Sequence, residues 1–371
     1  MKKILWITWK DIKHPQAGGA EIVDNEIAKR MVKEGHQVIF LTGGFENCQP
    51  EEKVNGYRII RLGNRFSIYF QVFRYYKKFL GGWADLVIEE VNTLPFFTRY
   101  YVREKRLLFF HQLCREKWLY EMFWPASWLG YFLEPLYLRL IRREKAITVS
   151  RDTRDDLITI GFEKEKIALI HIASNFRPQN KFSIKSSNYI LSLNSIRPSK
   201  KTLDTIRAFE IAKTKLPELK LIVAGKPNGR YGRKVLREVM NSKYTDSIEF
   251  YGRVSEKVKK ELIQKSKLVC APYVKEGWGL VVAEANTQAV PVVAYRVSGL
   301  RESVVDNVTG LLCDQNPRDL AKSIIKLFND QKIYERLSKN AWMGTKNRSF
   351  DQTYLDFLDG LKRLRYGQFF R

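Results

Sequence analysis

The sequence has few cysteines and few histidines, which limits the kinds of site that it can build. Its four cysteines lie far apart and form no C-x-x-C pair, and its four histidines are dispersed over 371 residues. This pattern disfavours both a structural zinc site and a disulfide scaffold. It is typical of a protein that works in a reducing compartment.

Long apolar runs are also missing. Residues 1–8 begin with positive charge and continue apolar, as a signal peptide does, but the run ends at Lys10 and is too short for one. We interpret it as a buried first strand. The longest candidate for a membrane span, residues 122–133, is bounded by Glu121 and Glu134, whereas a span takes about 20 apolar residues. We therefore expect a protein that is soluble or peripheral to a membrane.

Positive charge, by contrast, is abundant. Lys and Arg number 65 against 40 Asp and Glu, which gives a formal net charge of +25, within otherwise globular proportions of 44% hydrophobic and 28% charged residues. Residues 1–174 carry +7 and the remainder +18, so phosphate chemistry is expected first in the second half. Such charge predicts an anionic partner: nucleic acid, a phosphate-rich small molecule or an acidic membrane surface.

Strand and helix patterns alternate along the chain. Apolar runs typical of buried strands occupy residues 4–8, 37–42, 84–89, 106–110 and 146–150, and residues 20–34 have helical spacing. The periodicity vanishes over residues 175–187. A second series follows, with strands expected at 189–194, 219–224, 248–251, 268–271 and 290–295, and helices at 201–215 and 352–364. Strand–helix–strand repetition of this kind predicts parallel sheets.

We therefore predict an α/β protein with two doubly wound domains. The first covers residues 1–174, a linker covers 175–187, the second domain covers 188–345, and a C-terminal helix with a basic tail covers 346–371. Ligands of such sheets bind outside the carboxyl ends of the strands, so the cleft between the two domains is the expected site.

The most informative segment starts at Glu276 and reads E-G-W-G-L-V-V-A-E-A. Gly277 and Gly279 allow the backbone to approach a ligand closely. The helix expected over residues 280–288 presents free N–H groups and its positive dipole end near Gly279, Leu280 and Val281. Such a helix start is suited to a phosphate.

Glu284 lies about one turn into that helix, a rise of ~5.4 Å. Its carboxylate is placed to accept hydrogen bonds from a ribose beside the phosphate, and Glu276 is placed to touch whatever the phosphate carries. Two glutamates at this spacing also arise by chance in a chain so rich in charge. The glycines, the preceding Pro272 and the following apolar strand favour a site.

This region resembles the signature of glycosyltransferase family 4. The resemblance rests on the strand, Pro272, E-G-x-G-x-x-x-x-E-A and x-P-V-V-A taken together. The resemblance implies the GT-B fold, in which two Rossmann-like domains face a central cleft, with the C-terminal helix returning to the first domain. It also implies a retaining transfer of a hexose from a UDP-, GDP- or ADP-sugar to a glycan or lipid-linked acceptor. The protein would then be cytoplasmic, and peripheral at the inner face of the cell membrane. In the family, the residue matched by Glu276 contacts the donor sugar, and that matched by Glu284 contacts the ribose.

Two segments of the first half carry further resemblance. The loop that contains Gly18 and Gly19 is similar to the family's glycine loop, which approaches the donor diphosphate and sugar, although such a pair before a helix also forms plain turns. His111 follows the strand 106–110 and matches a histidine that lines the cleft near the transferred sugar. The alternative for His111 is a hydrogen-bonded core histidine.

The loop after the strand 189–194 resembles the family's diphosphate-binding loop. Lys200 matches its lysine, but Ser195 stands where the family has an arginine, and Arg197 lies two residues further on. We expect Arg197 to take the arginine's role, and a solvated cationic loop is the alternative. Segments 298–302 and 306–310 also resemble late motifs of the family.

No D-x-D triplet occurs, which argues against a metal-clamped diphosphate. We expect no metal and no cofactor, so Lys200, Arg197 and backbone amides must neutralise the leaving group. Retention in this family is commonly attributed to front-face attack, in which the acceptor hydroxyl passes its proton to the departing phosphate oxygen. This needs no carboxylate base, and the expected catalytic residues are Glu276, Lys200 and His111.

Residues 115–143 form the most aromatic stretch and include many basic residues. Aromatic and basic side chains together suit an anionic bilayer surface, so we predict a membrane patch or a groove for a lipid-linked acceptor. The alternative is that these are core helices. Pro125 and Pro135 predict that no single long helix spans the stretch. The candidate residues are Trp118, Trp124, Trp128, Tyr131, Arg139, Arg142 and Arg143.

Two other functions stay open at this point. A GT-B-like sugar-phosphate synthase or phosphorylase would share the donor site and differ in its acceptor. A nucleic-acid binder would explain the net charge, but the sequence has no recognised nucleic-acid module and its basic residues are scattered. We therefore expect no nucleic-acid partner.

Overall fold

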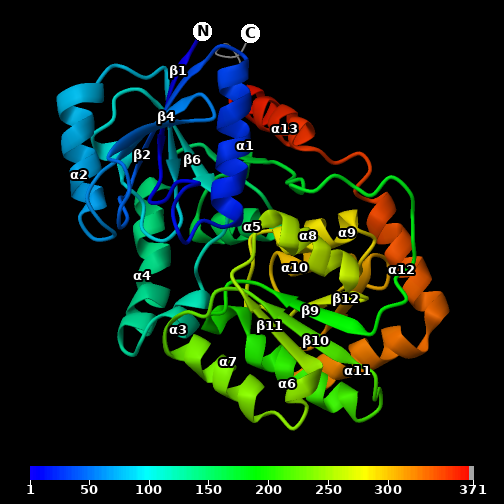
Figure 1. Cartoon of the computed structure of the whole chain (residues 1–371). Helices are drawn as coiled ribbons and strands as arrows, with labels where there is room; N and C mark the ends of the chain where they lie inside the picture. Colours follow the sequence, from blue (N-terminus) through cyan, green and yellow to red (C-terminus); the bar gives the residue numbers. More distant parts are fainter. Residues whose placement is uncertain (367–371) are drawn as a thin grey trace. The chain divides into compact units, whose positions relative to one another are not determined.

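The computed structural model describes residues 1–366, and the chain divides into two compact units (Figure 1). The first unit comprises residues 1–115, residues 129–172 and the C-terminal residues from Phe350. The second comprises residues 116–128 and 173–349. Each unit contains one sheet that is parallel apart from a single hairpin in the first, which confirms the predicted α/β class. Residues 116–128 lie within the stretch predicted as the first domain, yet they pack with the second unit.

The first unit has an eight-stranded sheet in the order β3-β4-β2-β1-β5-β6-β7-β8. Its strands are β1 (Lys3–Ile7), β2 (Gln37–Thr42), β3 (Glu51–Val54), β4 (Tyr57–Arg61), β5 (Leu86–Glu90), β6 (Lys105–Phe110), β7 (Ala146–Thr148) and β8 (Ile167–Leu169). Of these strands, β3, β4 and β8 were not predicted from the sequence. The turn Asn55-Gly56 joins β3 to β4, and both residues have positive φ, as two-residue hairpin turns require.

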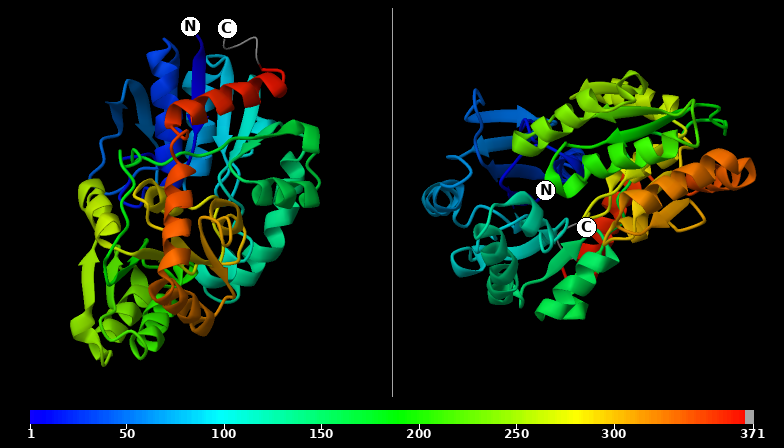
Figure 2. Two further views of the ribbon diagram at one scale, coloured as in Figure 1. Left: turned by 90° about the vertical axis from the view of Figure 1, so that its right-hand side faces the viewer. Right: turned by 90° about the horizontal axis from the view of Figure 1, so that it is seen from below.

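Alternate side chains of β1 pack into two different hydrophobic cores. Leu5 and Ile7 pack toward α2 (Ile68–Tyr75) and η1 (Tyr76–Leu80). Trp6 points to the opposite face, where its ring stacks on that of Phe357 from α13 (Phe350–Arg363). α13 lies beside α1 (Gly19–Lys33), as Figures 1 and 2 show. The C-terminal helix therefore returns to the first unit, as predicted.

No single helix spans residues 115–143, as predicted, but the break lies at Pro125 and not at Pro135. Pro125 separates α3 (Lys117–Glu121) from α4 (Ala126–Ile141), but α4 runs through Pro135. A proline within a helix leaves the carbonyl four residues earlier without its donor. That carbonyl belongs to Tyr131, and the Arg115 guanidinium donates a hydrogen bond to it over 3.2 Å. The arginine thus replaces the missing donor, and the helix continues.

The second unit has a six-stranded parallel sheet in the order β11-β10-β9-β12-β13-β14. The strands are β9 (Tyr189–Leu193), β10 (Lys220–Ala224), β11 (Ile248–Gly252), β12 (Leu268–Ala271), β13 (Val292–Tyr295) and β14 (Gly310–Cys313). Strand order reverses between β9 and β12. In sheets of this kind, ligands bind at the carboxyl ends of the strands at such a reversal. The loops that follow β9 and β12 are therefore the first place to look for a site.

Helices cover both faces of this second sheet (Figure 1). One face carries α6 (Thr202–Lys213), α7 (Gly229–Asn241) and α11 (Pro317–Asn329); the other carries α8 (Glu256–Lys265) and α9 (Leu280–Thr287). The unit is completed by α10 (Leu300–Ser303) and α12 (Gln331–Met343), and α5 (Arg151–Ile160) belongs to the first unit. Among the helices of residues 1–366, none combines the length and apolar character needed to span a bilayer.

Candidate functional site

The loops after β9 and β12 bring Lys200 and Glu276 together. The Lys200 ammonium forms an ion pair with the Glu276 carboxylate and lies 3.8 Å from the centre of the Tyr273 ring. Burial lowers the pKa of Lys200, even beside this carboxylate. Burial also opposes the charge on Glu276, but the cations Lys200, Lys117 and Arg197 outweigh it and lower the pKa of Glu276 to about 2. Glu276 is therefore ionised throughout the neutral range.

The backbone around Glu276 is fixed by close contacts with the loop before α10. The Glu276 N–H donates a hydrogen bond to the Ser298 carbonyl over 3.1 Å. Gly299 has a φ of +78°, and a Cβ at this position would lie 2.1 Å from the Glu276 carbonyl oxygen. This packing requires glycine. The N–H groups of Leu280 and Val281 then begin α9, directly after Gly279, and the first N–H groups of a helix have no intrahelical acceptor.

Glu284 lies on α9 and is almost completely buried. Its Oε1 lies 2.6 Å from Nζ of Lys259 on α8, and that Nζ also lies 2.9 Å from the Glu256 carboxylate. Burial raises the pKa of Glu284. For Lys259, the two carboxylates outweigh burial and raise its pKa. No motif of the sequence indicated Lys259, which joins the predicted Glu284 in one buried ion pair.

Arg197 lies near this group but has a different immediate partner. Its Nε is 3.5 Å from Oε1 of Glu121, and its side chain is 39% exposed. Glu121, from α3, also accepts hydrogen bonds from the Ser199 hydroxyl and from the Ser199 N–H. Ser195, at the family's arginine position, instead accepts a hydrogen bond from the Asn228 amide over 3.0 Å. Glu121 thus fixes the loop that carries Lys200, a role that no motif of the sequence indicated.

In the first unit, the glycine loop is held by an acid–base pair. Gly18 precedes α1, Gly19 is its first residue, and the Gly18 N–H donates to Oε2 of Glu21 over 2.6 Å. The other oxygen of Glu21 lies 2.8 Å from Nζ of Lys10. The predicted glycines therefore adopt a fixed turn with a buried ion pair beneath it.

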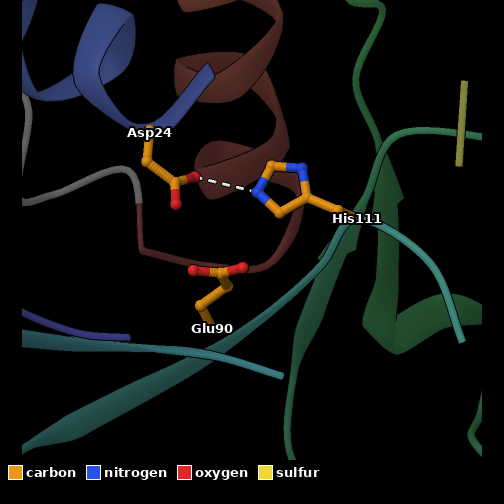
Figure 3. A group of neighbouring side chains, drawn as sticks. All are labelled: Asp24, Glu90 and His111. Atoms are coloured by element: carbon orange, nitrogen blue, oxygen red, sulfur yellow. Dashed lines mark hydrogen bonds and ion pairs between the residues drawn. The ribbon is translucent and has the colours of Figure 1, made fainter. Parts of the chain in front are cut away.

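His111 follows β6 and belongs to a buried polar cluster (Figure 3). Its Nε2 lies 2.9 Å from Oδ1 of Asp24 on α1, and the Glu90 carboxyl, at the end of β5, lies beside both. The Thr8 hydroxyl donates a hydrogen bond to Glu90. Burial raises the pKa of Asp24 well above its usual range, raises that of Glu90 to about 8 and lowers that of His111.

The three side chains Asp24, Glu90 and His111 also have one potential metal-binding atom each within 4.8 Å of one another. Two carboxylates and an imidazole form a donor set that many divalent cations accept. However, the His111 nitrogen nearest the cluster is already engaged by Asp24. A hydrogen-bonded network therefore accounts for this arrangement without an ion.

The raised pKa of Glu90 predicts a pH-dependent stability. Between pH 4.5 and 8 the unfolded chain loses the Glu90 proton while the folded protein keeps it, so this group lowers stability progressively as pH rises. The variant Glu90→Gln has no titrating group at this position. We therefore expect the difference in unfolding temperature, variant minus wild type, to increase from pH 5 to pH 8 in thermal denaturation. A difference that is constant over this range would contradict the assignment.

The predicted aromatic patch is partly core and partly surface. Leu138 and Ile141 of α4 are buried in the core of the first unit, as the core alternative requires. The opposite face of the same helix is apolar and exposed, at Trp128, Leu129, Phe132, Leu133, Leu136 and Leu140. Trp124 is exposed as well, Trp118 and Tyr131 are half-buried, and Arg139, Arg142 and Arg143 are exposed.

Two family models match this chain and meet where the predicted linker region begins. Residues 17–173 match "Glycosyltransferase Family 4", and residues 174–342 match "Glycosyl transferases group 1". An uncharacterised glycosyltransferase from Haemophilus influenzae is 24% identical over 332 residues, which span 87% of this chain and 90% of that protein.

Solved structures of similar fold cover nearly the whole chain. Sucrose-phosphate synthase from Thermosynechococcus elongatus has a TM-score of 0.80 at 19% identity, covering 98% of this chain and 99% of its own. Anabaena HepE in complex with UDP-glucose has a TM-score of 0.75 at 17% identity, covering 98% and 100%. These neighbours share the two Rossmann-like domains of the GT-B fold. The matched models and the shared fold show that the chain belongs to glycosyltransferase family 4, the group 1 glycosyl transferases.

Proposed function

We propose that this glycosyltransferase is a retaining, metal-independent hexosyltransferase that uses a nucleotide-diphosphate sugar. One observation carries the proposal. The Lys200–Glu276 ion pair stands where strand order reverses in the second unit, beside the start of α9, with Glu284 one turn further along that helix. A cation, free helix N–H groups and two carboxylates are the groups needed to bind a diphosphate, a sugar and a ribose.

In this proposal each group has a separate role. The N–H groups of Leu280 and Val281 and the Lys200 ammonium bind the diphosphate. Glu284, oriented by Lys259, accepts hydrogen bonds from the ribose hydroxyls. Glu276 contacts the hexose, and its low pKa keeps it a hydrogen-bond acceptor. The Arg197 side chain is 39% exposed and its contact with Glu121 is 3.5 Å long, so it is able to turn toward the diphosphate.

The chemical step needs stabilisation of the leaving group rather than a carboxylate base. The bond between the anomeric carbon and the diphosphate oxygen breaks, and charge grows on that oxygen. The acceptor hydroxyl attacks the same face of the sugar and passes its proton to the departing oxygen. Lys200 stabilises the growing negative charge from a fixed position, held by Glu276 and the Tyr273 ring, so no reorganisation is required during the step.

The donor is identified by comparing nucleotide sugars directly. We expect at least one of UDP-glucose, GDP-mannose and ADP-glucose to raise the unfolding temperature, since a ligand that binds only the native state stabilises it. UDP-glucose is the first to test because HepE, a structural neighbour, was solved with it. Transfer is then measured with lipid extracts, with sugar phosphates and with free phosphate as acceptors. Transfer to sugar phosphate or to free phosphate would favour the synthase or phosphorylase alternative.

We further propose that α4 brings the first unit to an anionic membrane surface, where a lipid-linked acceptor would lie. Its exposed apolar face, which includes Trp128, Phe132 and Leu136, is followed by three exposed arginines. Insertion of such side chains and attraction of arginine to anionic lipid reinforce each other.

The double variant F132S/L136S tests the membrane contact by co-sedimentation with vesicles of phosphatidylglycerol and phosphatidylcholine. Removing two large apolar side chains from the contact is expected to weaken partitioning by more than tenfold, at about 1.5–3 kcal/mol for each fully buried side chain. Ile211→Ser is the control, because it removes an exposed apolar side chain from a helix of the second unit. Equal sedimentation of the wild type and the double variant would refute the contact.

A further inference from the structure

The cluster around His111 contains two buried carboxyl oxygens without a hydrogen-bond partner. They are Oδ2 of Asp24 and Oε1 of Glu90. Both side chains are only 2% exposed, and their carboxyl groups lie beside one another in Figure 3. A buried acceptor that stays unsatisfied costs about 1–3 kcal/mol, and more when it is charged. Two facing carboxylates would also repel each other.

One proton placed between these two oxygens gives both of them a hydrogen-bond partner and removes the repulsion between two carboxylates. If Glu90 carries it on Oε1, it donates to Oδ2 of Asp24, while its Oε2 still accepts from the Thr8 hydroxyl. Oδ1 of Asp24 then accepts the hydrogen bond from His111 Nε2. All four carboxyl oxygens of Asp24 and Glu90 then have a hydrogen-bond partner. Together the two carboxyl groups carry one negative charge.

The surrounding charges agree with a single negative charge in the cluster. The charged groups that face it are Lys10 and Glu21, which already neutralise each other across 2.8 Å. Among the described residues, no cation in direct contact with the cluster is therefore left to balance the charge of a second carboxylate. A proton on one of the two carboxyl groups removes that charge.

We infer that Asp24 and Glu90 are positioning residues that share one proton and thereby hold His111 as the neutral tautomer protonated on Nε2. A carboxylate that accepts from one ring nitrogen fixes both the tautomer and the ring orientation. Nδ1 of His111 is then an acceptor. The inference rests on the proposed function in one respect: if the protein transfers a sugar, Nδ1 is available to accept a hydrogen bond from a sugar hydroxyl.

Nitrogen-15 NMR of selectively labelled histidine measures the tautomer without any substrate. The chain has only four histidines, so His14, His36 and His171 serve as internal references in the same spectrum. We expect the wild type at pH 7 to show a protonated Nε2 and an unprotonated Nδ1 for His111. In Asp24→Leu the acceptor is gone, and we expect averaged signals from both tautomers.

Two conservative variants make the test specific. Asp24→Asn keeps an oxygen that accepts from Nε2, and Glu90→Gln keeps an N–H that donates to Asp24. Both are therefore expected to retain the wild-type tautomer, whereas Asp24→Leu is also expected to lower kcat/KM about tenfold. If the transfer assay fails for every donor, the proposed function falls, but the tautomer measurement still tests the proton-sharing pair.

Three results would overturn the inference. The first is a wild-type His111 that is protonated on Nδ1 alone or on both nitrogens at pH 7. The second is an unchanged tautomer in Asp24→Leu. The third is selective broadening of the His111 signals by equimolar MnCl₂, reversed by EDTA, which would make the cluster a cation site instead.

Discussion

Replacing Lys200 by alanine is expected to lower kcat about 100-fold, the scale of losing one fixed group that stabilises growing negative charge. In this structure the loss has two parts. The diphosphate loses a cation whose position is fixed by the Glu276 carboxylate and the Tyr273 ring. Glu276, in turn, keeps its charge in a buried place without its main partner. Steady-state kinetics with the donor found in the binding panel measures the effect.

Lys257→Ala provides the control, since it removes an exposed lysine of the second unit that has no part in the proposed site. Because Lys200 and Glu276 form one ion pair, the effects of K200A and E276Q are expected to be less than additive, although E276Q also weakens the contact of Glu276 with the hexose. A K200A variant that folds and turns over at the wild-type rate would disprove the role of Lys200. Fully additive effects would show that the ion pair between them contributes nothing to catalysis.

Replacing Lys259 by alanine is expected to raise KM for the nucleotide sugar about tenfold or more, with a much smaller change in kcat. Lys259 touches Glu284 rather than the reacting atoms, and it holds the carboxylate that would accept from the ribose. Without its ammonium, the buried Glu284 takes up a proton more readily, since burial already raises its pKa. Loss of a hydrogen bond to a charged group is worth about 1.5–3 kcal/mol.

The same control, Lys257→Ala, lies two residues away on the same helix α8 and leaves Glu284 untouched. We expect its KM to equal that of the wild type. If K259A lowered kcat and left KM unchanged, Lys259 would act in the chemical step and the assignment of Glu284 to the ribose would be wrong.

The main elements of the fold were predictable because local patterns encode them. The strand and helix ranges predicted from apolar runs and helical spacing match the observed bounds within two residues, from β1 to α13. The hairpin β3–β4 was not predicted, although Asn55-Gly56 is the turn that such a hairpin prefers. Its first strand is mostly charged and lies at the edge of the sheet, so it has no apolar signal. The path of α4 through Pro135 depends on Arg115, a contact that no local rule encodes.

The site divides in the same way. Glu276, Lys200 and Glu284 belong to short motifs on loops and helix starts, and such motifs are readable in one sequence. Lys259 and Glu121 reach these motifs through the tertiary structure, from elements distant in sequence. Asp24 and Glu90 were equally invisible, because a charged residue within a helix or strand usually faces solvent and only the fold buries these two beside His111.

We propose that the second unit binds a nucleotide sugar through Lys200, Glu276 and Glu284. The most direct test is a crystal structure of the protein with the nucleotide sugar that raises its unfolding temperature most. We predict a Glu284 oxygen within hydrogen-bond distance of a ribose hydroxyl, Lys200 on a diphosphate oxygen and Glu276 on the hexose. A nucleotide sugar bound in clear density elsewhere, with the Lys200–Glu276 and Lys259–Glu284 pairs undisturbed and untouched, would contradict it.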